Sequence, residues 1–179
     1  MSSCPETVIR LATPLDVDSV TSIYDRIHTA EECGRLKTGW IRGVYPVRDT
    51  AISSLERGEL FVEESDGIAV GCAVINRIQP DVYREADWKY NVPDSKIMVL
   101  HTLAIDPYKI RCGLGKAFVS FYEEYAKEHG CESLRLDTNV LNVNARAFYN
   151  KLGYTEAGVR PCNFNGIAGI NLVMLEKKL

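Results

Sequence analysis

The feature that most constrains this chain is a buried strand that leads through a glycine loop into a helix. Residues 96–105 (KIMVLHTLAI) are almost entirely apolar, as expected for a central strand covered on both faces. Asp106-Pro107 ends this strand, and the following loop carries Gly113 and Gly115. From Leu114 the apolar residues recur with helical spacing as far as Tyr125, which predicts an amphipathic helix. A strand and a helix joined in this way predict an α/β protein.

The glycine loop has the properties of an anion-binding site. Glycine lets the backbone approach a ligand closely, and the N–H groups at the start of a helix can hold phosphate oxygens. Lys109, Arg111 and Lys116 add positive charge to the same stretch. Two nucleotide motifs are excluded, because GxxxxGK[ST] is absent and Phe118 stands where a dinucleotide fingerprint needs its third glycine. A tight strand-to-helix turn without a ligand is the alternative interpretation.

The remaining sequence contains the hydrophobic patterns of further strands and helices, which we expect to fold together as one domain. The chain of 179 residues buries roughly two thirds of its unfolded surface in a single core, so we expect one domain over residues 1–179. The order of elements predicts a mixed α/β sheet of about seven strands with helices on both faces. Besides 96–105, we expect strands at 7–13, 60–62, 68–75, 133–137, 154–159 and 170–175, and helices from Pro14, over 49–57 and around 145–152.

Composition and charge exclude several classes of protein. The net charge is −3, so we expect no general affinity for nucleic acid or anionic membranes. The longest run without a charged or strongly polar residue, residues 67–75, is about half of what a bilayer-spanning helix needs, and residues 1–10 lack a signal-peptide pattern. We therefore expect a cytoplasmic protein. Its scattered cysteines are expected to be free thiols without a metal, namely Cys4, Cys33, Cys72, Cys112, Cys131 and Cys162.

A second motif follows the strand at 133–137. Asn142, Ala145, Tyr149, Gly153 and Tyr154 form the pattern Asn-x-x-Ala-x-x-x-Tyr-x-x-x-Gly-Tyr. Together with the glycine loop, this motif resembles the acetyl-CoA-binding half of the GNAT acetyltransferase superfamily. The close resemblance covers residues 99–158, and the earlier half matches in the order of its elements. The resemblance implies a mostly antiparallel sheet whose central strands, 96–105 and 133–137, splay apart to form a slot.

The resemblance also implies which residues bind acetyl-CoA. The backbone of Leu103, Ala104 and Ile105 would pair with the pantetheine arm. The pyrophosphate would be held by backbone amides of the loop that comprises Arg111, Cys112, Gly113, Leu114, Gly115 and Lys116. The family usually has Gln or Arg where this chain has Ile110, so we expect the amides to supply the phosphate contact. Asn142 would hydrogen-bond the coenzyme arm or cap its helix, and the two roles can coexist.

Two residues are candidates for proton transfer. Attack of an amine on a thioester expels a thiolate, and Tyr149 is a candidate proton donor to it. A tyrosine on an apolar helix stripe can equally be a core residue. His101 lies two residues before Leu103 on the central strand, and imidazole titrates near working pH. It is therefore our candidate general base, with a hydrogen-bonded core histidine as the alternative.

Other ionisable residues are weaker candidates. Glu63 and Glu64 are alternative bases, unless they form a solvated strand face. His28 and His129 fall within predicted helices and are expected at the surface. Cys112 is expected to be a small loop residue, because direct attack by an amine needs no acyl-enzyme.

Two irregular segments are candidates for the acceptor pocket. Residues 31–48, a candidate lid, and 79–94 are rich in aromatic residues, which bind apolar or cationic groups but can also simply anchor loops. Acidic residues of the second segment could steer a cationic amine or remain solvated. The residues concerned are Trp40, Tyr45, Trp88 and Tyr90, with Asp81, Glu85 and Asp87.

These observations favour an acetyl-CoA-dependent N-acetyltransferase. The acceptor would be a primary amine of a small molecule or peptide that attacks acetyl-CoA directly in a ternary complex, without a metal. The alternative is a noncatalytic acyl-CoA-binding module that senses or presents the thioester. A structural or interaction protein on the same fold is a third hypothesis. A homodimer is compatible with the sequence, which does not fix the oligomeric state.

Overall fold

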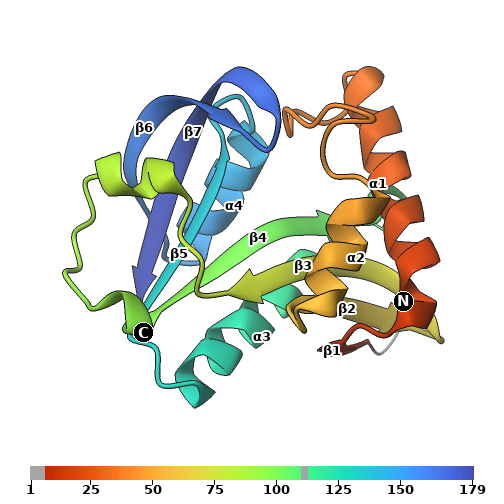
Figure 1. The fold of residues 1–179 in the computed structure, drawn as a ribbon, viewed down its shortest axis with the longest axis horizontal. Coiled ribbons are helices and arrows are strands. Elements are labelled where there is room, and N and C mark those ends of the chain that lie inside the picture. Colours follow the sequence, from red (N-terminus) through yellow and green to blue (C-terminus); the bar gives the residue numbers. More distant parts are fainter. Residues whose placement is uncertain (1–6, 110–112) are drawn as a thin grey trace.

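The structure, a computed structural model, describes residues 7–109 and 113–179. Its centre is a seven-stranded sheet with the strand order β1-β2-β3-β4-β5-β7-β6 (Figure 1). The sheet and its strand number confirm the predicted architecture. The strands are β1 (Val8–Leu11), β2 (Leu60–Ser65), β3 (Ile68–Asn76), β4 (Ile97–Ile105), β5 (Ser133–Asn139), β6 (Thr155–Phe164) and β7 (Ile167–Lys178).

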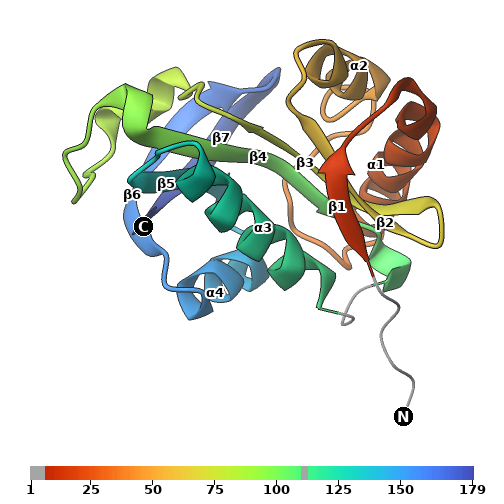
Figure 2. The same cartoon turned by 90° about the horizontal axis from the view of Figure 1, so that it is seen from below.

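Helices cover both faces of the sheet, as Figure 2 shows. The helices α1 (Val17–Glu32) and α2 (Arg48–Glu56) pack on one face, and α3 (Leu114–Glu128) and α4 (Val143–Lys151) pack on the other. The apolar stripes found in the sequence face these two cores. Val20 and Tyr24 of α1 are buried in the first core, and Phe118 and Tyr122 of α3 are buried in the second. Short 3₁₀ turns complete the fold, namely η1 (Pro14–Asp16), η2 (Asp81–Glu85), η3 (Asp94–Lys96) and η4 (Pro107–Lys109).

The central strands β4 and β5 run parallel and then separate. Their pairing joins Ile97–Leu100 to Ser133–Leu136, although β4 continues to Ile105 and β5 to Asn139. Thr102 has a left-handed φ of 53°, and β4 changes its register with β3 at this point. A bulge of this kind bends a strand and interrupts its ladder. The sheet is therefore open between the later parts of β4 and β5, which confirms the predicted splay.

The last hairpin is longer than the sequence analysis predicts. The expected strands at 154–159 and 170–175 extend to β6 and β7, which pair as far as Phe164 and Ile167. Asn165 and Gly166 both have a left-handed φ, so they form the two-residue turn typical of a tight hairpin. Polar and glycine residues near the tip hide this strand pairing from hydrophobic periodicity.

The expectation that His28 lies at the surface is wrong, and so is the interpretation of Glu63 as part of a solvated strand face. His28 is 2% exposed, because the loop before α2 brings the carbonyl of Pro46 to 2.9 Å from its Nε2. Glu63 is fully buried on β2, where one carboxylate oxygen accepts a 2.9 Å hydrogen bond from the Thr7 hydroxyl. A strand between two others can bury a polar residue as long as a neighbouring side chain donates to it.

Two further expectations concern membranes and cysteines. Over residues 7–109 and 113–179, no helix combines the length and the apolar character needed to cross a membrane. Cys33, Cys72, Cys131 and Cys162 are free thiols, as predicted. The remaining cysteines, Cys4 and Cys112, lie outside the described residues.

Candidate active site

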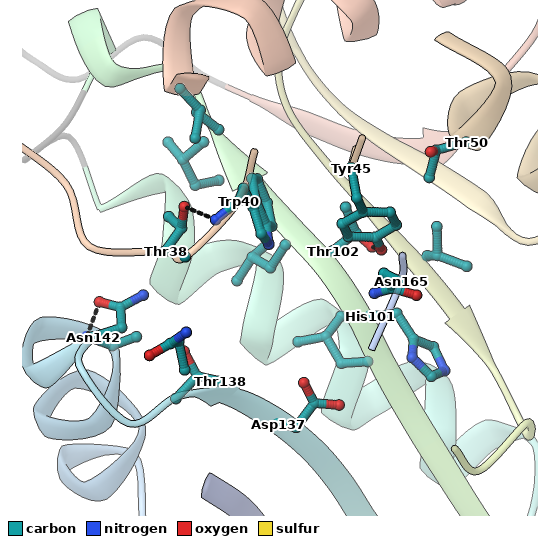
Figure 3. A pocket seen from close by; sticks show the side chains of 18 of the residues that line it. Thr38, Trp40, Tyr45, Thr50, His101, Thr102, Asp137, Thr138, Asn142 and Asn165 are labelled. Atoms are coloured by element: carbon teal, nitrogen blue, oxygen red, sulfur yellow. Dashed lines mark hydrogen bonds between the residues drawn. The ribbon is translucent and has the colours of Figure 1, made fainter. Parts of the chain in front are cut away.

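A cavity of about 920 Å³ lies where β4 and β5 separate (Figure 3). Its walls come from β4, the end of β5, the first turns of α3 and α4, the loop between α1 and α2, and the β6–β7 hairpin. Residues far apart in the sequence therefore enclose one continuous space. The lining includes residues from both regions that the sequence analysis connects with chemistry, namely Gly113 and Gly115 of the glycine loop and Asn142, Ala145 and Tyr149 of the second motif.

One end of the cavity lies at the N-terminus of α3. Gly113 has a φ of 79°, and a Cβ placed there would have no described atom within 4 Å. The N–H of Ala117 bonds to the carbonyl of Gly113 at 3.0 Å, so the N–H groups of residues 114–116 precede the helical hydrogen-bond ladder. Lys109 and Lys116 line the same end. These donors and charges fit the phosphate groups of coenzyme A. Arg111 and Cys112 lie outside the described residues.

The second part of β4 borders the slot between the strands. Leu103 and Ile105 line the cavity, whereas the Ala104 side chain is buried in the core beside α1. Beyond Leu100 this strand has no pairing with β5. Its free edge can therefore pair with an extended ligand as another strand would. The predicted backbone contacts of Leu103, Ala104 and Ile105 with a pantetheine arm remain a prediction.

Tyr149 projects from α4 into the cavity. The residue is 6% exposed, and its hydroxyl is not among the buried polar atoms that lack a partner. Burial, with a smaller effect of the Asp137 charge, raises the pKa of Tyr149 above its ordinary value. The hydroxyl is therefore protonated at neutral pH. Asn142 caps α4, because its Oδ1 accepts a 3.2 Å hydrogen bond from the Ala145 N–H, and it also lines the cavity.

His101 lines the cavity from β4, next to the bulge. The Asn76 amide donates to Oε2 of Glu59 at 3.0 Å, so its Oδ1 faces the Ile78 N–H at 2.9 Å and His101 Nε2 at 3.0 Å. A carbonyl oxygen only accepts, so Nε2 carries the hydrogen of the neutral ring and Nδ1 keeps a lone pair. Burial lowers the pKa of His101 to about 4. The imidazole is therefore neutral at physiological pH.

Asp137 is a cavity residue that the sequence analysis does not identify as functional. It lies at the end of β5, one position beyond the last residue paired with β4. The Tyr83 hydroxyl donates a 2.8 Å hydrogen bond to its Oδ2. Burial raises the pKa of Asp137 to about 6, against the opposing effect of this hydrogen bond. The sequence does carry a signal for Asp137. It is an acidic residue at the end of a predicted buried strand, next to the place where the two central strands are predicted to separate.

The loop between α1 and α2 supplies an aromatic wall. The rings of Trp40 and Tyr45 contact edge to face, with centroids 6.1 Å apart, and the Tyr45 hydroxyl hydrogen-bonds the hydroxyl of Thr102 on β4. Glu31 of α1 fixes the start of this loop, because its carboxylate accepts hydrogen bonds from the N–H of Thr38 at 2.6 Å and of Gly39 at 3.1 Å. The candidate lid segment is therefore a structured wall of the cavity (Figure 3).

Several candidates lie away from the cavity. The Trp88 indole donates to the carbonyl of Tyr83 at 2.7 Å and covers the Arg135 guanidinium. Glu64 accepts a 2.8 Å hydrogen bond from Arg10 on the edge strand. The following residues also do not line the cavity: Glu63, Tyr90, Asp81, Glu85, Asp87, His28 and His129. In the described part of the chain, no cluster of His, Cys, Asp and Glu side chains has a metal-binding arrangement.

Comparison with known proteins supports the resemblance seen in the sequence. The acetyltransferase (GNAT) family matches residues 20–154. An uncharacterized N-acetyltransferase of Methanocaldococcus jannaschii is 30% identical over 100 residues, which cover 56% of this chain and 44% of that protein. Human N-acetyltransferase 8 is 29% identical over 104 residues, which cover 58% of this chain and 41% of that protein. The chain therefore spans less than half the length of these relatives.

Solved structures share the fold at low sequence identity. A GNAT-family acetyltransferase from Streptococcus agalactiae has a TM-score of 0.78 and 24% identity, covering 97% of this chain and 95% of its own. A Salmonella typhimurium protein solved with its cofactor acetyl-CoA has a TM-score of 0.68 and 18% identity, covering 97% of this chain and 94% of its own. With the family match extending over residues 20–154, most of the sequence, this chain belongs to the acetyltransferase (GNAT) family.

Proposed function

We propose that this chain transfers the acetyl group of acetyl-CoA to a primary amine by direct attack in a ternary complex. The observation that carries the proposal is a single cavity that joins three features. These are the free N–H groups of α3, the open edge of β4 and two proton-carrying side chains, Tyr149 and His101. A protein that only binds acyl-CoA needs the first two features but has no use for the third.

Acetyl-CoA, when bound, would supply the acetyl group and a thiolate leaving group. The N–H groups of residues 114–116, with Lys109 and Lys116, would hold its phosphates. The free edge of β4 over Leu103–Ile105 would hold its arm in the slot. The two ends of the cavity would then bring the thioester and the amine together, which removes much of the entropic cost of their reaction.

The chain's own residues would manage the protons. The amine nitrogen bonds to the acetyl carbon while the carbon–sulfur bond breaks. His101 accepts at Nδ1, since Nε2 donates to Asn76, the proton that the bound ammonium loses to become the attacking amine. Tyr149 gives its hydroxyl proton to the departing sulfur, and its raised pKa keeps that proton available until the thiolate forms. The nitrogen then loses its second proton to the Tyr149 oxygen and His101 returns its proton to solvent, so that the products are an N-acetyl amide and the free thiol.

An acetyl-transfer assay tests this proposal. The purified protein is mixed with acetyl-CoA and a panel of primary amines, and both free thiol release and the acetylated product are measured. We expect equal amounts of thiol and N-acetyl product. Tight binding of acetyl-CoA without any transfer would instead favour the noncatalytic sensor, and absence of binding would contradict both hypotheses.

A further inference from the structure

Asp137 is the only acidic side chain that lines the cavity, counted over the residues that the structure describes. In the view of Figure 3 its side chain is drawn between those of Thr138 and His101, below Trp40. A primary amine is an ammonium ion near neutral pH, and binding an ammonium away from water requires an opposite charge or hydrogen-bond acceptors. Among the described residues, Asp137 is therefore the one side chain of this cavity whose negative charge can pair with an incoming ammonium.

The carboxyl of Asp137 is held in place with one oxygen free. Its Oδ2 accepts the 2.8 Å hydrogen bond from Tyr83, which is itself 2% exposed. Its Oδ1 receives no hydrogen bond from a described side chain, yet it is not among the buried polar atoms that lack a partner. Oδ1 is therefore open to the cavity and can accept a charge-assisted hydrogen bond from a ligand.

The remaining acceptor wall is largely apolar and aromatic. Trp40 and Tyr45 lie on one loop, and Phe164, Ile170 and Leu172 come from the β6–β7 hairpin. Such surfaces stabilise a flat apolar group, and aromatic faces also attract a cation. The wall thus provides apolar contacts for the body of a ligand whose charge is bound elsewhere.

The basic side chains of the cavity lie away from this wall or are already paired. Lys109 and Lys116 are at the phosphate end, beside α3. Arg57 borders the cavity from the end of α2, and its Nε donates to Glu59 at 2.8 Å. A carboxylate attached next to the amino group would thus approach Asp137 rather than an unpaired cation, and like charges in a confined site repel.

We propose that the acceptor is a monoamine with an apolar body, whose ammonium is bound by Asp137 and which carries no carboxylate beside the amino group. This inference rests on the proposed acetyl transfer and names its substrate class. An α-amino acid would place a second carboxylate against Asp137. A diamine would bring a second ammonium into a cavity that has no second acidic side chain among the described residues.

A matched set of amines tests the inference. Phenylalanine, phenylalaninamide and 2-phenylethylamine share one apolar body, and only phenylalanine has a carboxylate beside its amino group; putrescine supplies the diamine. We expect kcat/KM for 2-phenylethylamine to exceed that for phenylalanine and for putrescine by about tenfold or more. Phenylalaninamide should be closer to 2-phenylethylamine than to phenylalanine, because its amide is neutral.

Substitutions then assign the effect to Asp137. Asp137→Asn keeps an acceptor oxygen for Tyr83 but removes the charge, so KM for 2-phenylethylamine should rise about tenfold or more, while the Kd for acetyl-CoA stays unchanged. Tyr83→Phe removes the hydrogen bond that positions the carboxyl and that opposes the rise of its pKa. Measured at pH 8, above the pKa of Asp137, it should raise KM less and leave kcat nearly unaltered. Asp81→Asn is the matched control, because Asp81 is an exposed acid outside the cavity that pairs with Arg84.

The outcomes separate the inference from the proposed function. If the protein acetylates amines but prefers phenylalanine or putrescine, or if Asp137→Asn leaves KM unchanged, the inference is wrong and acetyl transfer stands. If acetyl-CoA binds and 2-phenylethylamine is not acetylated, the inference is also wrong. If neither acetyl-CoA binding nor transfer to any amine occurs, the proposed function itself fails.

Discussion

Nε2 of His101 lies 3.0 Å from Oδ1 of Asn76, a contact between two strands that fixes the protonated nitrogen of the ring. The Asn76 amide is oriented in turn by Glu59, to which its nitrogen donates at 3.0 Å. With Nε2 donating to Asn76, Nδ1 of His101 keeps its lone pair. Because burial lowers the pKa of His101 to about 4, the ring is in its neutral form at pH values above about 4.

His101→Gln tests the role of this nitrogen. The glutamine amide can still donate to Asn76, but it cannot accept a proton. We expect kcat to fall about 100-fold or more near neutral pH, with a loss that shrinks as rising pH deprotonates the amine itself. The measurement is kcat/KM for one amine between pH 5 and 10. Full activity with an unchanged pH profile would remove His101 from the mechanism.

The ionisation of Asp137 should make the KM for the amine depend on pH. The side chains of Tyr83, Tyr45, Tyr149 and Cys162 are close enough for its charge to affect their pKa values. Its pKa is raised to about 6, so the carboxylate is lost as pH falls through that value. We therefore expect KM for 2-phenylethylamine to rise below about pH 6 in the wild type and to be flat in Asp137→Asn.

The same substitution has a predictable effect on stability. A carboxyl whose pKa is raised on folding disfavours the native state once it is ionised, and this cost grows as pH rises from the unfolded value of 3.8 to about 6. Asp137→Asn should therefore melt at the same or a higher temperature than the wild type at pH 8. A clearly lower melting temperature would mean that the Asp137 carboxylate supports the fold.

Tyr149→Phe separates chemistry from binding. The phenylalanine ring fills the same buried space on α4, so the melting temperature and the Kd for acetyl-CoA should change little. Without the hydroxyl proton, kcat should fall about 10²- to 10⁴-fold. Steady-state rates and a titration with acetyl-CoA provide the comparison, and an unchanged kcat would exclude Tyr149 as the proton donor.

A pair of substitutions at Gly115 tests the phosphate end of the cavity. A Cβ at this position would lie 3.5 Å from Phe148, an ordinary contact, so Gly115→Ala should retain acetyl-CoA binding. The indole of Gly115→Trp would occupy the space beside the α3 N-terminus and should abolish binding. Both variants are titrated with acetyl-CoA after circular dichroism has shown that they fold. If Gly115→Trp binds acetyl-CoA as tightly as Gly115→Ala, the phosphates of the coenzyme bind elsewhere.

Much of the fold could be predicted because its signals are local. The helical stripe from Leu114 and the apolar run at 96–105 specify α3 and β4 by periodicity alone. The glycine loop and the Tyr149 motif add a resemblance that specifies which strands separate. The two strands of the β6–β7 hairpin are predicted too short, because the residues on either side of the turn at Asn165 and Gly166 lack an apolar pattern.

The site was less predictable because it is assembled from distant segments. Trp40 and Tyr45 reach the cavity while Trp88 does not, although all three lie in similar irregular sequence. The difference depends on how each loop packs, which periodicity does not report. Asp137 and its partner Tyr83 are 54 residues apart, so only the folded structure reveals that a hydroxyl holds this carboxyl at the open edge of the sheet.

Isothermal titration with acetyl-CoA tests the proposed acetyl transfer most directly, because the coenzyme must bind between the α3 N-terminus and the open edge of β4 for the reaction to occur. The wild-type protein is titrated with acetyl-CoA and, separately, with free coenzyme A. We predict binding of acetyl-CoA with a Kd of about micromolar or tighter, corresponding to about 8 kcal/mol. No measurable heat with either ligand, at concentrations far above that Kd, would contradict the proposed function.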